Sequence, residues 1–403
     1  MTLGMLLLYA ALLPWVAVSA VSLFLVDRFA RDWQRHTART PALPENPPEA
    51  AVIVPVKGDS PSVRASIEAY ANLDYPRYRL LIAVEARDDP VYGYASALAL
   101  SRPGRVGVIV AGRAGRGAQK VANQLAAWRS LPETTQVVCF GDADALPPPD
   151  WLAGLTAWIL VVPDQALVSG YRWLMPADGR WSTRVACAIN AGVATAMRHR
   201  RWNLAWGGAM GAHRALWRRI DFERTLDGVA SDDLVLGNAV RRCGGYIEQV
   251  RDLLVPSPAA MDWAGCLGFI RRQYTMLWLY SRKHWLLGAA ATTTVSLGWA
   301  AALLAAWRGW PWMVPLMTTV YALDCLRAWR RWRFAARKWS DAASRRALKS
   351  AFLVDAFATP LVMLVHALCV WSTLFRRRFE WAGISYDASN PARVIVVGRK
   401  TAA

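Results

Sequence analysis

Two aspartates separated by one residue, Asp142 and Asp144, directly follow the apolar run VVCFG. Carboxylates spaced i and i+2 at the end of a strand can both approach one divalent cation, Mg²⁺ or Mn²⁺. A cation held there would stabilise the charge on a departing diphosphate. Aspartate pairs are also common in surface turns, which is the structural alternative. The placement at the end of an apolar strand favours the metal site.

A second acidic segment, Arg87-Asp88-Asp89-Pro90, follows the apolar run RLLIAV and Glu85. In a doubly wound sheet this loop borders the nucleotide crevice, where a carboxylate accepts hydrogen bonds from a base or a ribose. Glu85 and Asp89 are therefore candidate donor-binding residues. The structural alternative is a solvated loop with an Asp-Pro turn.

A third segment, Ser231-Asp232-Asp233-Leu234, starts the helical pattern DLVLGNAVRRC. In the functional interpretation, one of the two aspartates faces an acceptor hydroxyl and removes its proton as a general base. In the structural interpretation, Ser231 or Asp232 caps the helix, and the carboxylates are favoured in its first turn by the helix dipole. Position alone favours the structural interpretation.

Two further stretches have the composition of a substrate site. Lys120 and Asn123 lie on one face of the helix predicted after the loop GRAGRGAQ, where Lys120 could neutralise phosphate charge or remain an ordinary solvated lysine. The glycine-rich stretch Trp206 to Gly211 permits close backbone approach to a substrate, or forms a structural turn.

These residues require a scaffold of alternating strands and helices. Strand-like apolar runs alternate with helical patterns such as PSVRASIEAYANL and GAQKVANQLAAWRS, which predicts βαβ units. We therefore predict an α/β fold with a mostly parallel, Rossmann-like sheet, helices on both faces, and ligands at the carboxyl ends of the strands. The predicted strands cover residues 51–56, 79–85, 105–112 and 135–142.

The N-terminus predicts a membrane anchor. Residues 5–26 are uncharged and long enough to cross a bilayer as a helix. Arginines at 28, 31, 35 and 39 follow, which indicates that the C-terminal side is cytoplasmic; a cleaved signal peptide would carry its positive charges before the apolar run. A basic and Pro-rich linker over 28–49 then leads into the predicted catalytic domain, 50–267.

The composition agrees with a membrane protein. Hydrophobic residues make up 55% of the 403 residues, there are 22 Trp, and the net charge is +19. The basic residues cluster beside the apolar runs, as the positive-inside rule predicts, and no base-reading or stacking features indicate nucleic acid. The six cysteines are scattered, which gives no zinc knuckle or redox motif and fits a reduced cytosolic face.

The C-terminal third is predicted to return to the membrane. An amphipathic interfacial segment covers 268–284, and apolar runs over 285–326 predict two transmembrane helices. After a basic loop over 327–350, the run 351–375 is flanked on both sides by basic residues and interrupted by a charge and a proline, so a crossing and a re-entrant hairpin are equally compatible. A cytoplasmic tail over 376–403 completes the chain.

Taken in order, several short motifs resemble the ceramide glucosyltransferase family of inverting, GT-A-type enzymes. They are PVKG (55–58), LDYPRY (73–78), RDDP (87–90), KVAN (120–123), GDAD (141–144) and SDD (231–233). The resemblance implies that Asp89 lies at the nucleotide, and that Asp142 lies near the donor diphosphate and metal, with Asp144 completing the DxD pair. It also implies that Asp233 is the catalytic base. Trp381 and Tyr386 resemble aromatic residues of the family's C-terminal tail.

One motif departs from the family. Members carry a Gln- or Arg-x-x-Arg-Trp signature, whereas this chain has Tyr274 and Leu277 at the two polar positions when Trp278 is aligned with the family tryptophan. Arg272 or Gln273 then takes over contacts to the diphosphate or the acceptor. Candidate residues for these contacts are Asp232, Arg272, Gln273, Trp278 and Tyr386.

The leading hypothesis is a single displacement by a membrane-bound glycosyltransferase of the bacterial inner membrane, with its catalytic domain on the cytoplasmic side. A UDP-sugar such as UDP-glucose or UDP-N-acetylglucosamine donates to the hydroxyl of a ceramide or hopanoid-like lipid, which gives a β-linked glycolipid. The alternatives are a processive polysaccharide synthase and, outside enzymes, a transporter or scaffold with a degenerate transferase domain.

Overall fold

The computed structural model describes all residues except 1–2, 197–199, 201 and 401–403. The described chain divides into two compact units. The sheet unit comprises residues 33–173, 197–258 and 377–403, and the helical unit comprises 1–32, 174–196 and 259–376. Each unit is described by itself.

A seven-stranded sheet in the order β3-β2-β1-β4-β6-β5-β7 supports the sheet unit. The first four of these strands are parallel, and Val52 of β1 lies opposite Leu80 of β2 and Cys139 of β4. β6 runs antiparallel to both β4 and β5. The mostly parallel α/β prediction is thereby confirmed. The strands are β1 (Ala50–Pro55), β2 (Tyr78–Val84), β3 (Val106–Val110), β4 (Val137–Gly141), β5 (Ala166–Pro176), β6 (Ala209–His213) and β7 (Tyr246–Ala259).

The helices of the sheet unit follow from local sequence signals. Ser60 caps α2 by accepting a hydrogen bond from the Val63 amide, and Pro61 occupies the first helical turn, where its missing N–H has no cost. Every residue of β1 and β4 is buried, as expected for strands covered on both faces. The helices are α2 (Pro61–Ala71), α3 (Tyr92–Ser101), α4 (Gln119–Arg129), α5 (Trp151–Val161), α7 (Arg214–Arg219), α8 (Phe222–Leu226) and α9 (Asp232–Arg242).

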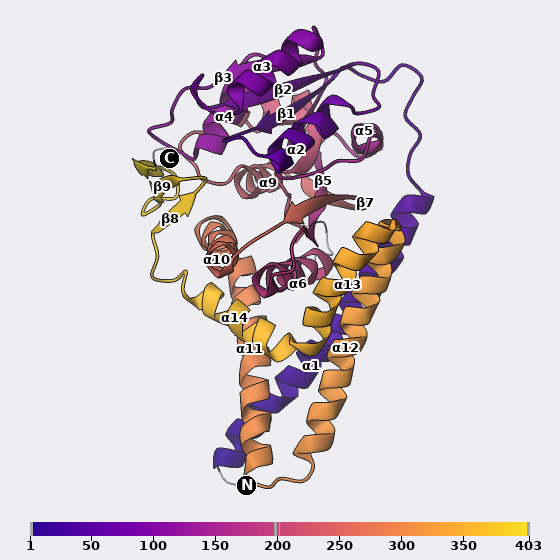
Figure 1. Cartoon of the computed structure of the whole chain (residues 1–403), viewed down its shortest axis with the longest axis vertical. Coiled ribbons are helices and arrows are strands. Elements are labelled where there is room, and N and C mark those ends of the chain that lie inside the picture. Colours follow the sequence, from indigo (N-terminus) through magenta and orange to yellow (C-terminus); the bar gives the residue numbers. More distant parts are fainter. Residues whose placement is uncertain (1–2, 197–199, 201, 401–403) are drawn as a thin grey trace. The chain divides into compact units, whose positions relative to one another are not determined.

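The C-terminal residues of the sheet unit form a second, three-stranded antiparallel sheet, drawn in yellow in Figure 1. Its strands are β8 (Arg378–Trp381), β9 (Ile384–Asp387) and β10 (Ile395–Arg399). Ala382 and Gly383 join β8 to β9 with φ values of 49° and 72°. Two successive residues at positive φ make the tight hairpin turn that matches strand twist, and Gly383 adopts this conformation without strain.

The helical unit contains the apolar helices. Two helices are long and apolar enough to cross a membrane in the described part of the chain, over Ala11–Ala38 and Arg282–Trp307. A third candidate is the pair α13 and α14, which is bent by 87° at the break between them. The helices are α1 (Leu3–Ala38), α6 (Trp181–Ala196), α10 (Trp263–Tyr280), α11 (Arg282–Trp307), α12 (Met313–Lys338), α13 (Ala342–Phe357) and α14 (Thr359–Trp371).

The element boundaries differ in places from those expected. α1 continues through the basic segment to Ala38, where Arg28 and Asp32 form an i,i+4 ion pair, so the stretch without regular structure begins at residue 39. α6 lies within 50–267 but belongs to the helical unit. α12 begins at Met313, within the apolar run 310–326, and continues through an arginine-rich half, so it is not among the candidate spans.

Close packing and buried ion pairs hold the helical unit together. Trp15 of α1 is fully buried, and the ring of Trp299 packs edge-on against it at 5.0 Å between centroids. A Cβ atom on Gly298 would collide with the Trp15 ring, so a glycine is required there. In the same unit, the buried side chains of Arg331 and Asp355 form an ion pair of 3.1 Å. Buried charges need such partners.

Candidate active site

Asp142 and Asp144 lie where β4 ends, as the sequence indicates. Asp142 is largely buried and Asp144 is exposed. Both carboxylates converge on one guanidinium group, because Arg172 Nη2 lies 3.1 Å from Asp142 Oδ2 and 3.0 Å from Asp144 Oδ1. The Arg172 guanidinium also stacks over the Trp206 ring at 4.9 Å. Arg172 of β5 therefore places a positive charge beside both carboxylates at the end of β4.

Lys120 connects the end of β4 to the start of α9. Its Nζ atom lies 2.8 Å from Asp142 Oδ1 and 3.2 Å from Asp232 Oδ1. Burial lowers the pKa of Lys120, but the charges of Asp142, Asp232 and Asp233 outweigh that effect, so its pKa is raised and the ammonium stays charged. Lys120 thus brings two of the acidic motifs predicted from the sequence into one cluster.

Asp142 is ionised at neutral pH. Burial raises its pKa, but Lys120 and Arg172 lower it by more, and the result lies below the ordinary value for aspartate. A carboxylate with two cationic partners therefore keeps its negative charge in a water-poor environment.

Asp232 is an anchor within the cluster. It is buried, and its Oδ2 atom accepts a hydrogen bond of 2.7 Å from Gln124 Nε2 while Oδ1 faces Lys120. Gly207 passes so close that a Cβ atom there would lie 2.6 Å from Asp232 Oδ2 and 2.8 Å from Lys120 Nζ. The glycine-rich stretch before β6 therefore allows close backbone approach to the acidic cluster itself.

Asp233 has a different environment from Asp232. Its Oδ2 atom accepts from the Gly207 amide at 3.1 Å, and its Oδ1 atom accepts from the Ser231 hydroxyl at 2.6 Å and from the Leu234 amide at 2.7 Å. Burial and then the neighbouring charge of Asp232 raise its pKa above the ordinary value. Asp233 is partly exposed and is held by neutral donors, which suits a carboxylate that accepts a proton.

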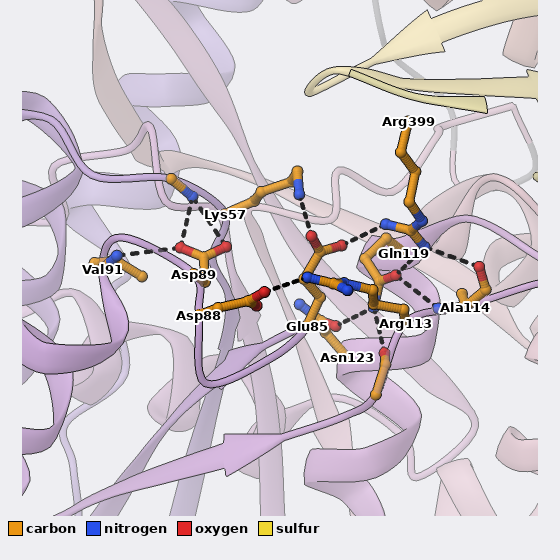
Figure 2. Close-up of polar contacts among 12 residues, drawn as sticks. Lys57, Glu85, Asp88, Asp89, Val91, Arg113, Ala114, Gln119, Asn123 and Arg399 are labelled. Carbon is orange, nitrogen blue, oxygen red and sulfur yellow. Dashed lines mark hydrogen bonds and ion pairs between the residues drawn. The ribbon is translucent and has the colours of Figure 1, made fainter. Parts of the chain in front are cut away.

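Glu85 lies between two cations at the end of β2 (Figure 2). Lys57 pairs with Oε1, and Arg399 Nη1 lies 2.6 Å from Oε2. Both partners lie at strand ends: Lys57 comes shortly after β1, and Arg399 is the last residue of β10. Glu85 is buried, and these two ion pairs supply the partners that a buried carboxylate needs.

Asp89 connects two loops at the same edge of the sheet. Its Oδ1 atom accepts from the backbone amide of Gly58 at 3.0 Å. It also accepts from the Val91 amide at 3.1 Å, as Figure 2 shows. Gly58 has a φ of 73°, which glycine adopts without strain. The neighbouring Asp88 is exposed and pairs with Arg113. The RDDP segment thus combines a buried structural carboxylate with an exposed one.

An open cavity of about 490 Å³ lies beside these residues. Its wall comes from the segments that follow β2 and β3, at the carboxyl edge of the parallel strands, where α/β proteins bind nucleotides. The lining residues are Glu85, Ala86, Arg87, Asp88, Val110, Gly112 and Arg113.

Asn123 and Tyr386 are both buried and have structural partners. Asn123 Nδ2 donates to the Ala83 carbonyl at 2.9 Å, and its Oδ1 atom accepts from Gln119 Nε2 at 2.9 Å. The Tyr386 hydroxyl accepts from the Gln119 amide at 3.2 Å, where α4 begins. Trp381 lies with its ring 5.9 Å from Lys120 Nζ. The tail aromatics therefore contact the first turn of α4.

The remaining predicted residues belong to the helical unit. Arg272, Gln273 and Trp278 lie on α10, where Trp278 packs edge-on against Trp285 at 4.9 Å. Tyr274, which replaces a polar position of the family signature, is buried and shares a 2.8 Å hydrogen bond with His366. Contacts of this segment to substrate stay a prediction.

The two carboxylates after β4 fit a divalent cation. They already converge on a single cationic group, and oxygen ligands are those that Mg²⁺ and Mn²⁺ prefer. Among the described residues there is no group of three or more Asp, Glu, His or Cys side chains that could hold a metal. A cation between Asp142 and Asp144 would therefore take its other ligands from the donor diphosphate and water.

Several residues of the cluster were not identified from the sequence. Arg172 lies within the strand ALVSGYRWLMP, where the one signal is a charged residue in a buried strand. Gln124 lies one turn after Lys120 on α4, a spacing that places both on one face of the helix. Arg399 ends the short strand β10 near the C-terminus and carries no motif signal.

Comparisons with known proteins identify the family of this chain. Residues 8–394 match the model of glycosyl transferase family 21. The chain therefore belongs to this family and is a glycosyltransferase, which confirms the resemblance noted from the motifs. A comparison with curated proteins gives no match.

One solved structure shares the fold with a TM-score above 0.5, and two others are similar over parts of their length. The mannosyltransferase PcManGT from Pyrobaculum calidifontis, in complex with GDP-Man and Mn²⁺, is 18% identical with a TM-score of 0.52, over 88% of this chain and 99% of that chain. S. aureus TarS 1-349 with UDP-GlcNAc is 10% identical over 87% and 100% of the chains, with a TM-score of 0.39. Glucosyl-3-phosphoglycerate synthase from Mycobacterium tuberculosis, with Mn²⁺, UDP and phosphoglyceric acid, is 16% identical over 57% and 78%, with a TM-score of 0.37.

Proposed function

We propose that this glycosyltransferase moves a sugar from a UDP-sugar to the hydroxyl of a membrane lipid, with inversion, to make a β-linked glycolipid. The observation that carries the proposal is the position of Lys120, which contacts both Asp142 and Asp232. Through this contact the end of β4, which suits a diphosphate, lies beside the start of α9, which carries Asp233. Donor and acceptor groups of a single displacement need this proximity.

In this proposal the donor lies along the carboxyl edge of the sheet. The nucleoside occupies the cavity beside Glu85, and Asp89 holds the loop that follows β2. The diphosphate extends towards Asp142, where Lys120 and Arg172 supply positive charge. A Mg²⁺ or Mn²⁺ ion held by Asp142 and Asp144 would add Lewis-acid stabilisation of the departing diphosphate.

Asp233 acts as the general base. The proton of the lipid hydroxyl moves to its carboxylate while the hydroxyl oxygen attacks the anomeric carbon and the bond to the diphosphate breaks. Its raised pKa makes it a stronger base than a solvated aspartate while the Ser231 hydroxyl and the Gly207 amide keep its orientation. A single displacement inverts an α-linked donor into a β-linked product.

The lipid acceptor is supported by the helical unit. Leu361, Leu364 and Leu368 of α14 are 56%, 45% and 63% exposed at the spacing of one helix face, which suits contact with acyl chains. The 87° bend and the basic residues on both flanks of 351–375 support a re-entrant pair whose two ends stay on the cytoplasmic side. The sheet unit is then cytoplasmic at a bacterial inner membrane, after a span by α1.

The topology has a direct test. Single cysteines at Ser344 and Ser389, in a background without native cysteines, are reacted with a membrane-impermeant maleimide in right-side-out and inverted vesicles. The re-entrant arrangement gives labelling of both positions in inverted vesicles alone. Labelling of the two positions from opposite sides would establish a crossing instead.

The function is tested by product analysis. Purified protein in lipid vesicles that contain ceramide or a hopanoid polyol is incubated with UDP-glucose or UDP-N-acetylglucosamine, and the lipids are examined by mass spectrometry. The expected result is one new glycolipid whose formation stops with EDTA and resumes with Mn²⁺ or Mg²⁺. Transfer of the sugar to a polymer, or no lipid product from any UDP-sugar, would contradict the proposal.

A further inference from the structure

We propose that Arg399, at the end of the C-terminal sheet, is a positioning residue of the nucleoside site and sets the affinity for the uridine diphosphate part of the donor. The inference rests on the proposed function, because it assumes that the cavity beside Glu85 takes the nucleoside. It goes beyond that function because it gives a role in donor binding to a residue of β10, a strand that is far in sequence from the motifs of the site.

Main-chain hydrogen bonds fix the C-terminal segment on two loops of the sheet unit. The Gly117 amide donates to the Val394 carbonyl at 2.8 Å, and the Val394 amide donates to the Gly228 carbonyl at 2.9 Å. The Val396 amide donates to the Gly115 carbonyl at 3.1 Å. One of these loops precedes α4 and the other precedes α9, so the tail is joined to both elements that supply Lys120 and the SDD segment.

The Arg399 side chain makes contacts beyond this attachment. In Figure 2 its guanidinium reaches from the yellow strands to Glu85, Gln119 and Ala114. Nη1 lies 2.6 Å from Glu85 Oε2, while Nη2 donates to the Ala114 carbonyl at 2.8 Å and to Gln119 Oε1 at 2.9 Å. The planar fork of an arginine can hold a carboxylate and two further acceptors at once, which an ammonium group cannot do in this geometry.

These contacts shape one wall of the cavity. Gln119 Nε2 donates to the carbonyl of Gly112, a lining residue, at 2.9 Å, and Gln119 Oε1 accepts from the Ala114 amide at 2.8 Å. Arg399 therefore fixes the Glu85 carboxylate directly, and through Gln119 it fixes the loop that follows β3. Both surround the space in which a base and ribose would be bound.

The charges around Glu85 give a second reason for a role of Arg399 in the nucleoside site. Glu85 is buried and forms ion pairs with two cations, Lys57 and Arg399, which offset its negative charge beside an anionic donor. A carboxylate fixed in this way can accept hydrogen bonds from ribose hydroxyls or from the imide N–H of uracil. Without Arg399, that carboxylate loses half of its charged partners and its fixed orientation.

The test is isothermal titration of UDP into full-length protein in detergent with Mn²⁺ present. We expect Arg399→Ala to weaken UDP binding about tenfold or more, the effect of removing a charge-assisted contact that orients a ligand group. The matched control is Lys400→Ala, because the side chain of the neighbouring Lys400 pairs with Glu380 on the surface and Lys400 is not among the residues that line the cavity. Its UDP affinity should stay within about twofold of wild type.

A second variant separates positioning from fold stability. Arg399→Lys keeps the charge and loses the fork, so we expect it to stay folded, to bind UDP several-fold more weakly, and to raise the KM for the donor with little change in kcat. Wild-type UDP affinity in both folded Arg399 variants would overturn the inference. If wild type itself binds no UDP, the proposed function fails, and that result is distinct from a loss confined to the Arg399 variants.

Discussion

The acidic cluster around Lys120 in the sheet unit differs in charge balance from the buried cluster of acidic and basic side chains around Asp355 in the helical unit. In the helical unit, Asp324 and Asp355 face Arg327 and Arg331, so carboxylates and guanidinium groups are equal in number. In the sheet unit, Lys120 and Arg172 face the four carboxylates of Asp142, Asp144, Asp232 and Asp233.

The difference separates a structural network from a ligand site. Equal numbers of buried charges neutralise one another, and such a network stabilises helix packing without a ligand. An excess of carboxylates, of which Asp144 and Asp233 are open to solvent, favours the approach of a further cation and a proton. The position of the excess, at the carboxyl edge of a parallel sheet, is where a nucleotide-sugar enzyme needs it.

The largest effect is expected from Lys120→Met. Loss of the ammonium leaves two buried carboxylates without a shared partner and removes positive charge beside the diphosphate, so turnover should fall by about a thousandfold. Initial rates of glycolipid formation, measured with folded protein confirmed by circular dichroism, check the prediction. An active Lys120→Met enzyme would mean that the sheet-unit cluster is structural, like that of the helical unit.

The contrasting change is Asp355→Asn in the helical unit. It leaves Arg331 without its carboxylate, and breaking such a buried pair costs about 3–5 kcal/mol. The midpoint of thermal inactivation in detergent should fall, whereas kcat of the protein that remains folded should stay near the wild-type value. A large loss of kcat with unchanged thermal stability would give this second cluster a part in the reaction.

A smaller effect, which also tests the comparison of the two clusters, is expected on the pH dependence of kcat/KM. Asp233 must be ionised to accept a proton, so kcat/KM falls as the pH decreases through its raised pKa. Burial is the first cause of that raised pKa and the charge of Asp232 is the second, so Asp232→Asn should move the acidic limb of the profile to lower pH. An acidic limb that stays in place in Asp232→Asn would assign it to another group.

Sequence patterns predicted the parallel half of this fold and much of the cluster. Continuous apolar runs indicated β1, β2, β3 and β4 because strands buried on both faces need apolar residues throughout. Asp142 and Lys120 were identified because they follow a strand and a glycine-rich loop.

Other features depend on tertiary contacts that no local pattern encodes. Arg172 lies in a long strand with no motif, and its role follows from the pairing of β5 with β6 beside β4. Arg399 reaches Glu85 across 314 positions of sequence, which only the folded chain reveals. The distinction between Asp232 and Asp233 likewise required the contacts of Gln124 and Gly207, since both aspartates occupy the first turn of the same helix.

The central claim is that Asp233 is the base of a sugar transfer, and the most direct measurement compares turnover and UDP binding in Asp233→Asn. The matched control is Asp150→Asn, an exposed aspartate of the same unit at the start of α5. The account predicts that Asp233→Asn lowers kcat by at least about a hundredfold while UDP affinity stays near that of wild type. Unchanged turnover in a folded Asp233→Asn enzyme would contradict it.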